Sequence, residues 1–179
     1  MAKNILQNSC DAAGLIKIQS QTASAVTVLT FTNLAQYQYT QYKLVGFQAS
    51  NTNAINPLLL QGSANNGASY FTSSYASIIG GSVTNGAFSL DDNGKVTTGL
   101  ILTTLGQLSV NTNFDYTIYN VNTNSGFFSH SGTSFESLTV GPFVCLAGGY
   151  YSVLSIINAV QITVLAGTFS GKFVLYGYS

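Results

Sequence analysis

The feature that most constrains the fold of this chain is a succession of short apolar and β-branched segments separated by polar turns. Residues 25–31, Ala-Val-Thr-Val-Leu-Thr-Phe, are rich in the β-branched and aromatic residues that strands favour. Apolar and polar positions alternate between Phe114 and Asn120, and again between Val160 and Val164. Alternation with a period of two predicts strands that place one face on a core. Only residues 150–160 hint at helical spacing, and we expect at most a short helical turn there.

Turn residues mark the boundaries of these segments. Asn65-Asn66-Gly67 predicts a hairpin turn, because Asn and Gly adopt a positive φ at little cost. Gly80-Gly81 predicts a break in a strand pattern that runs over residues 69–79, and residues 91–94, Asp-Asp-Asn-Gly, are the strongest turn signal. Residues 37–47 predict a strand with a bulge near Thr40.

Strands at intervals of about 8–12 residues predict an all-β fold, an antiparallel β-sandwich of jelly-roll-like character. The chain has 179 residues, enough for one domain with a substantial core. We assign residues 25–179 to the sandwich. Residues 1–24 fit the strand pattern poorly, and two interpretations stay open for them: an N-terminal arm that pairs with a neighbouring subunit, or a first strand.

The low charge of the chain excludes one class of partner and favours another. Only 6% of residues are charged, arginine is absent, and the five lysines are spread along the sequence. Nucleic-acid affinity needs several basic side chains against phosphates, so we expect no nucleic-acid binding. The net charge is zero, which promotes association and precipitation of a free domain. This composition favours a component of a larger assembly.

The sequence shows no targeting or metal-binding pattern. The N-terminal residues lack an apolar run followed by a small-residue cleavage site, so we expect synthesis in the cytoplasm without a signal peptide. The longest apolar stretches, such as residues 153–160, are far shorter than the roughly 20 residues that span a bilayer, so we expect no membrane insertion. Cys10 and Cys145 fit no metal spacing. Buried thiols are favoured for them, and a disulfide stays open.

No set of residues predicts catalysis, so we expect neither an enzyme nor a bound cofactor or metal. Nucleophilic catalysis needs a nucleophile beside a base. On a strand, Ser129 and Ser131 point away from His130, the only histidine, for which we expect a loop or surface position. Glycoside hydrolysis needs two carboxylates across a sugar ring, and Asp115 and Glu136 could meet across strands, but nothing in their spacing requires it. The five acids are Asp11, Asp91, Asp92, Asp115 and Glu136.

Aromatic and amide side chains in the turns are the candidate contact residues. The chain has eleven Tyr and eleven Phe, and Tyr with Asn and Ser makes a neutral, hydrogen-bonding surface of the type used by paratopes and sugar-binding sites. We predict surface contact for Tyr70, Tyr75, Asn122, Thr123 and Asn124. The competing interpretation is that the tyrosines pack in the core or between subunits.

Several segments together resemble small phage virion proteins of the tail-fibre or structural type. The resemblance covers most of residues 25–179, and the close of the chain, Ser170-Gly171-Lys172-Phe173-Val174-Leu175-Tyr176-Gly177, is its most recognisable part. The other segments that carry it are Tyr42-Lys43-Leu44-Val45, residues 59–67 and Ser74-Tyr75-Ala76. The resemblance implies a sandwich or jelly-roll domain, a homotrimer on the virion, contact with other virion proteins and no enzymatic activity. The chain departs from longer fibres because it has no coiled-coil shaft.

We therefore expect a virion structural protein of a bacteriophage, in the tail or tail fibre, that contacts a host surface glycan or protein. Two alternatives stay open. One is a head decoration, or cement, protein that stabilises the capsid. The other, from a different functional class, is a carbohydrate-binding module.

Overall fold

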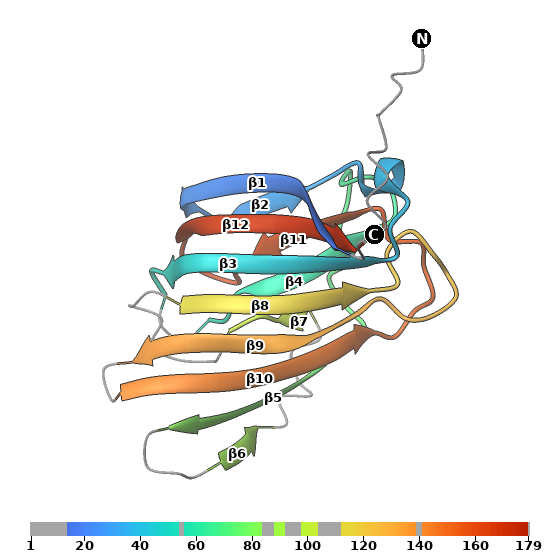
Figure 1. The fold of residues 1–179 in the computed structure, drawn as a ribbon. Coiled ribbons are helices and arrows are strands. Elements are labelled where there is room, and N and C mark those ends of the chain that lie inside the picture. Colours follow the sequence, from blue (N-terminus) through green and yellow to red (C-terminus); the bar gives the residue numbers. More distant parts are fainter. Residues whose placement is uncertain are drawn as a thin grey trace.

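Two antiparallel sheets pack face to face in the computed structural model (Figure 1), which describes residues 14–53, 56–83, 88–91, 98–103, 112–138 and 141–178. For residues 81–83, 88–91, 136–138 and 141–143 it describes the backbone alone. The described residues form twelve strands and one short 3₁₀ turn, η1 (Leu34–Tyr37). The predicted all-β antiparallel β-sandwich is confirmed. No helix in this part of the chain is long and apolar enough to cross a membrane.

The two layers differ in size. The large sheet contains, in spatial order, β1 (Leu15–Val26), β12 (Phe169–Tyr178), β3 (Gln41–Asn51), β8 (Thr112–Tyr119), β9 (Ser129–Leu138), β10 (Gly141–Tyr151), β5 (Tyr75–Val83) and β6 (Phe88–Asp91). The small sheet contains β2 (Val28–Phe31), β11 (Ala159–Thr163), β4 (Leu59–Ser63) and β7 (Leu100–Ile101). The small sheet packs on one face of the large sheet (Figure 1), and we call the opposite face the outer face.

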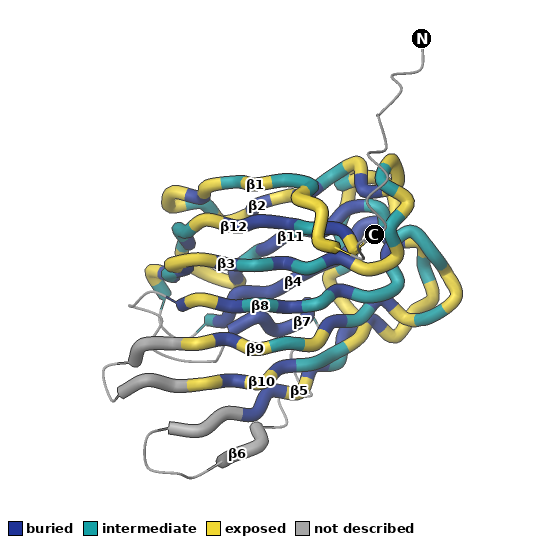
Figure 2. Tube along the Cα trace, viewed as in Figure 1, coloured by how far each residue is buried: buried dark blue, intermediate teal, exposed yellow. Residues whose placement is uncertain are grey.

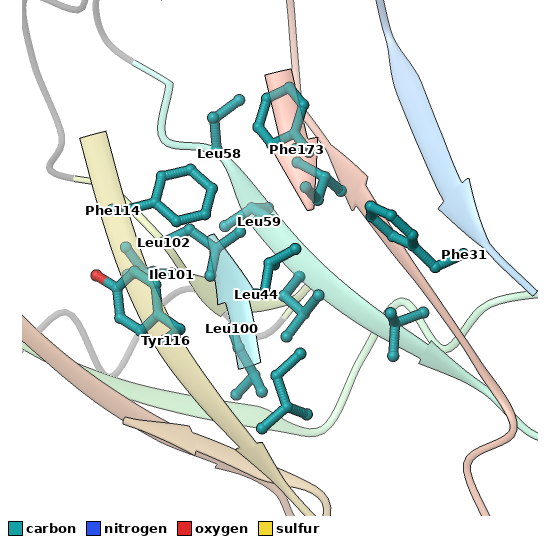
Figure 3. Close-up of a cluster of buried hydrophobic side chains, with 14 of the residues drawn as sticks. Phe31, Leu44, Leu58, Leu59, Leu100, Ile101, Leu102, Phe114, Tyr116 and Phe173 are labelled. Carbon is teal, nitrogen blue, oxygen red and sulfur yellow. The ribbon is translucent and has the colours of Figure 1, made fainter. Parts of the chain in front are cut away.

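Alternating side chains from both sheets fill the space between them (Figure 3). On β8 the burial pattern alternates as the sequence predicts, and Phe114 and Tyr116 point inward. They belong to one buried cluster with Leu44 of β3 and, from the small sheet, Phe31 and Leu60. Burial of each such side chain stabilises the fold by about 1.5–3 kcal/mol, so this layer is the main source of stability.

The first strand belongs to the sandwich of its own chain. β1 pairs antiparallel with β12 from Leu15, opposite Tyr178, to Val26, opposite Phe169. The Gln19 side-chain amide also donates to the Thr32 carbonyl at 2.8 Å, and Gln21 donates to Thr30. These amides satisfy carbonyls at the edge of the small sheet, where unpaired backbone groups invite aggregation. Residues 1–13, including Cys10, lie outside the described residues.

The predicted strand over residues 37–47 starts and ends in the wrong place. The chain forms η1 first, with Asn33 and Gln38 in the left-handed region at its two ends, and β3 begins only at Gln41. The irregularity is not near Thr40. It lies between Gly46 and Ala49, where the pairing of β3 with β8 shifts register.

Two turn predictions and one helix prediction also need correction. Asn65–Gly67 does form a turn with positive φ, but it does not close a hairpin, because β4 pairs with β11 and β7 while β5 pairs with β10 and β6. Gly80-Gly81 does not break the strand, since both residues lie in β5 and pair with β10. Residues 150–160 contain no helical turn: β10 runs to Tyr151 and β11 starts at Ala159. Of the turn predicted at residues 91–94, Asp91 ends β6 and the rest lies outside the described residues.

Candidate functional site

Two of the predicted contact residues are structural. Tyr75 is only 3% exposed, and its hydroxyl accepts a hydrogen bond from the Gly62 amide at 2.9 Å, so it is not available to a partner. Burial raises the pKa of Tyr75 well above its usual value. Asn122 is half-buried, and its amide nitrogen lies 3.0 Å from the carbonyls of both Leu34 and Tyr39. This side chain ties the loop after β8 to the segment before β3.

The other three predicted contact residues differ in exposure. Tyr70 is half-buried, and burial raises the pKa of its hydroxyl. The Thr123 hydroxyl accepts a hydrogen bond from the Ser125 amide at 3.2 Å, which shapes the tip of the predicted loop. Asn124 is exposed at that tip. Tyr70 and the Thr123–Asn124 tip lie on different connections, β4 to β5 and β8 to β9.

His130 is a core residue, so the expectation of a loop or surface position is wrong. It is 2% exposed on β9, its ring stacks on Tyr116 with centroids 5.0 Å apart, and its Nε2 lies 2.7 Å from the Ile101 carbonyl oxygen. Burial lowers the pKa of His130 to about 4, so the ring is neutral at pH 7 and its Nε2–H donates to that carbonyl. The exposed Ser131 lies on the opposite face of β9, as the strand geometry predicts.

The buried imidazole of His130 is hydrogen-bonded to β7, the edge strand of the small sheet. Ile101 in β7 uses its carbonyl for His130, and its amide donates to the Ser77 hydroxyl of β5 at 3.2 Å. Strand β7 has only two residues, and these bonds connect it to the large sheet. Since a buried backbone group without a partner is costly, the need to satisfy Ile101 accounts for a polar ring in the core.

The two acids considered for hydrolysis, Asp115 and Glu136, lie on neighbouring strands, β8 and β9. The register places Asp115 opposite Thr133 and Glu136 opposite Thr112, so the two acids are not cross-strand partners. Asp115 instead forms an ion pair with Lys43, with Oδ2 and Nζ 2.7 Å apart. This hydrogen bond raises the pKa of Lys43. No group of three potential metal ligands occurs among the described residues, and Cys145 is buried in the core.

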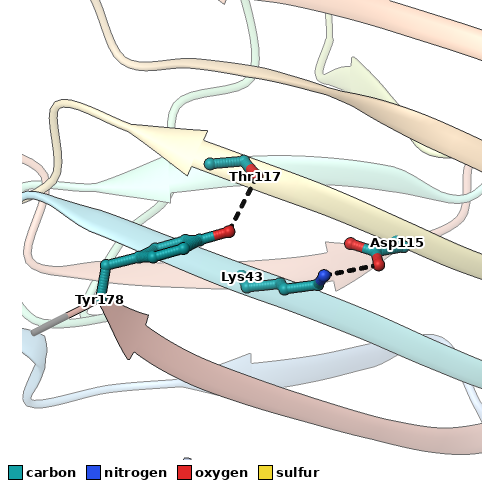
Figure 4. Close-up of polar contacts among 4 residues, drawn as sticks. All are labelled: Lys43, Asp115, Thr117 and Tyr178. Carbon is teal, nitrogen blue, oxygen red and sulfur yellow. Dashed lines mark hydrogen bonds and ion pairs between the residues drawn. The ribbon is translucent and has the colours of Figure 1, made fainter. Parts of the chain in front are cut away.

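On one half of the outer face of the large sheet, polar contacts link neighbouring strands (Figure 4). Over β12, β3 and β8, the Lys43–Asp115 ion pair lies beside a contact between the hydroxyls of Thr117 and Tyr178, 3.4 Å apart. A further cross-strand contact links the hydroxyls of Tyr119 and Ser131 at 3.2 Å. These polar groups bind one another, and the exposed apolar side chain beside them on β3 is Phe47, at 43%.

The other half of the same face is apolar, and we take it as the candidate functional site. We define the outer patch as the six exposed apolar side chains of β5, β9, β10 and the adjoining turn: Ile78, Phe127, Phe135, Val144, Leu146 and Tyr150. Their exposed fractions run from 44% for Phe127 to 60% for Ile78. The strand alternation that brings such positions to the surface is visible in Figure 2. Phe135 lies directly opposite Val144 across β9 and β10.

The rings of Phe127 and Tyr150 continue the outer patch toward the loop after β8. Their centroids are 5.7 Å apart, and the Asn120 side-chain amide donates to the Phe127 carbonyl at 2.8 Å. That hydrogen bond closes the loop that carries the predicted contact residues Thr123 and Asn124. The loop tip and Phe127 thus belong to the same connection between β8 and β9, and Phe127 contacts Tyr150 of β10.

The turn-based sequence reasoning missed the outer patch, although β10 carries a signal for it. From Val144 to Tyr151 the sequence is Val-Cys-Leu-Ala-Gly-Gly-Tyr-Tyr, which is apolar or glycine at both alternating positions. Such a run is typical of a strand that is covered on both faces. In this chain the side with Cys145 and Ala147 is buried, whereas Val144 and Leu146 are exposed.

Comparison with known proteins adds no further constraint. No protein-family model matches the chain, and neither does any curated protein.

Proposed function

We propose that this chain is a structural protein of a bacteriophage particle, a component of the tail or tail fibre that assembles with other subunits and contacts the host surface. The observation that carries the proposal is the outer patch, six apolar side chains exposed on one half of the outer face of the large sheet. The low charge of the chain and its closing Leu175-Tyr176-Gly177 segment support the same interpretation.

The size of the outer patch explains why assembly is the favoured role. Apolar side chains of this kind each have on the order of 100–250 Å² of surface, so six half-exposed ones present roughly 500 Å². That area is at the upper end of the largest apolar patch on a typical monomer, about 300–600 Å². At about 25 cal/mol per Å², covering it yields on the order of 10 kcal/mol before the entropic costs of association.

Particle localisation tests the proposal. Purified particles labelled with an antibody against this chain are expected to show the label on the tail, and a stained gel is expected to show tens of copies per particle. Label confined to the head shell, with hundreds of copies, would favour a decoration protein of the capsid instead. Absence of the chain from purified particles would overturn the virion assignment.

One observation favours a second candidate function, a carbohydrate-binding module. The rings of Phe127 and Tyr150 are 44% and 45% exposed beside the Thr123–Asn124 tip, and exposed aromatic rings with amide groups are suited to sugar rings. This function predicts that the isolated monomer binds a glycan array. Tyr150→Ala would abolish that binding, and Tyr178→Ala, on the polar half of the face, would leave it unchanged.

A further inference from the structure

Gly148 lies in the middle of the outer patch, and neither its backbone conformation nor its described neighbours require a glycine. Its φ is not among the positive values of this chain, so its backbone does not require glycine. A Cβ built on Gly148 would have one neighbour within 4 Å, the His130 carbonyl oxygen at 3.6 Å, which is ordinary van der Waals contact. The neighbouring Gly149 differs, because its Cβ would lie 2.5 Å from the Ala76 carbonyl oxygen.

A glycine inside a strand weakens it and often marks a place where another backbone or ligand approaches closely. Since no described residue fills the position above Gly148, we look for its explanation in a partner. Large side chains flank it on the same face: Ile78 lies opposite Gly148 on β5, and Leu146 precedes it along β10. Gly148 is therefore a position without a side chain beside two large exposed ones, Ile78 and Leu146, and we call it the hollow of the outer patch.

The sequence of β10 independently indicates that its second face is covered. Strand β4 shows what such coverage looks like, since all its residues are buried and the Thr98–Gly99 segment packs on its outer side. A Cβ on Gly99 would lie 3.0 Å from Leu59 Cβ. From Val144 to Tyr151, both faces of strand β10 carry apolar residues or glycine. Yet no described residue of the chain covers Val144 or Leu146.

We propose that the outer patch is the interface between two copies of this chain, packed sheet against sheet about a two-fold axis. An axis that crosses β10 at Ala147 would place Leu146 of each copy over Gly148 of the other. Protrusion and hollow thus occur in one patch, as a self-complementary two-fold contact requires. This inference rests on the proposed role in assembly and deepens it, because it names the partner and the surface.

Charge and area favour a second copy as the occupant. None of the six side chains of the outer patch is charged, so two patches can meet without like-charge repulsion or the burial of an unpaired charge. A standard interface takes about 800 Å² from each partner. The patch supplies roughly 500 Å² of this as apolar area, and the Ser, Thr and Ala positions between its members supply the rest.

Analytical ultracentrifugation of the full chain tests the inference. We expect a dimer with a dissociation constant at or below about 1 µM, within the range for interfaces of this size. In Gly148→Val the added side chain fills the hollow and favours the strand, so the fold is retained and dimerisation weakens at least tenfold. Leu146→Lys is expected to abolish the dimer. The matched control is Leu165→Lys, which replaces an equally exposed leucine in the β11–β12 connection and should leave the dimer intact.

The results that overturn the inference are distinct from those that overturn the proposed function. A wild-type chain that is monomeric, or a trimer, contradicts the two-fold interface, as does an unchanged dimer in both patch variants. Leu146→Lys keeps the test decisive if Gly148→Val fails to fold, because the lysine ammonium can extend into solvent. A chain that dimerises through the outer patch but is absent from particles leaves this inference standing without the virion role. A chain that is monomeric in solution but present in particles contradicts this inference and leaves the virion role standing.

Discussion

Acidification from pH 7 to pH 4 is expected to destabilise this fold through a single buried imidazole. His130 has a pKa of about 4 in the folded chain because burial disfavours its charged form, against 6.5 for an unperturbed histidine. Between those two values the unfolded chain binds a proton that the folded chain does not. The free energy of unfolding therefore falls as the pH falls through this window, and the loss is complete once the folded-state pKa is passed.

The magnitude follows from the difference between the two pKa values. Each unit corresponds to 1.36 kcal/mol, so the full loss is about 3 kcal/mol. No discount for solvent screening applies, since His130 is 2% exposed. A typical domain has only about 5–15 kcal/mol of stability, so this loss is readily measurable. Above about pH 6.5 His130 contributes no pH dependence.

The assay is urea unfolding at fixed protein concentration at several pH values between 7 and 4, on the wild type and on His130→Phe. The variant keeps a ring beside Tyr116 but cannot titrate, so its stability should lack the His130 slope in this window. It also leaves the Ile101 carbonyl without its donor, at a pH-independent cost of about 1–3 kcal/mol. Equal slopes for the two chains would refute the assignment of the acid sensitivity to His130. His130→Gln, which retains an amide donor, separates the hydrogen bond from the titration.

Three further outcomes follow from particular contacts. Asn122→Ala removes the amide that donates to the Leu34 and Tyr39 carbonyls, and it puts an alanine at a positive φ, which alanine disfavours. Urea unfolding should show a loss of about 2–3 kcal/mol in the free energy of unfolding. The control Asn124→Ala, at the exposed tip of the loop, should change it by less than about 0.5 kcal/mol. Gly132→Ala should cost about 3 kcal/mol or prevent folding, because its Cβ would overlap the Asp115 carbonyl oxygen, and a thermal midpoint within a degree of the wild type would contradict this. Asp115→Asn should cost only about 0.2–1 kcal/mol, and less in high salt, because its ion pair with Lys43 is partly exposed.

The class of fold could be predicted from the sequence because it depends on local patterns. On β8 the alternation from Phe114 to Tyr119 marks a strand and also its buried face, and the structure confirms both. The turn at Asn65–Gly67 is likewise local, since Asn66 and Gly67 are residue types that tolerate positive φ, and both adopt it here. Such features need no knowledge of which strand lies beside which.

Strand partners and strand faces were decided only by the tertiary structure. The pairing of β1 with β12 joins the two ends of the described chain, and no local pattern encodes a contact of that length. On β9 the inward row contains His130, Gly132 and Ser134, while Phe135 points outward, so hydrophobicity does not reveal which face is buried. That choice is made by Tyr116, which stacks on His130 and leaves no room for a side chain at Gly132. The core accepts small and polar residues where a neighbouring ring fills the space and a backbone group needs a partner, and both conditions exist only once the sheets are packed.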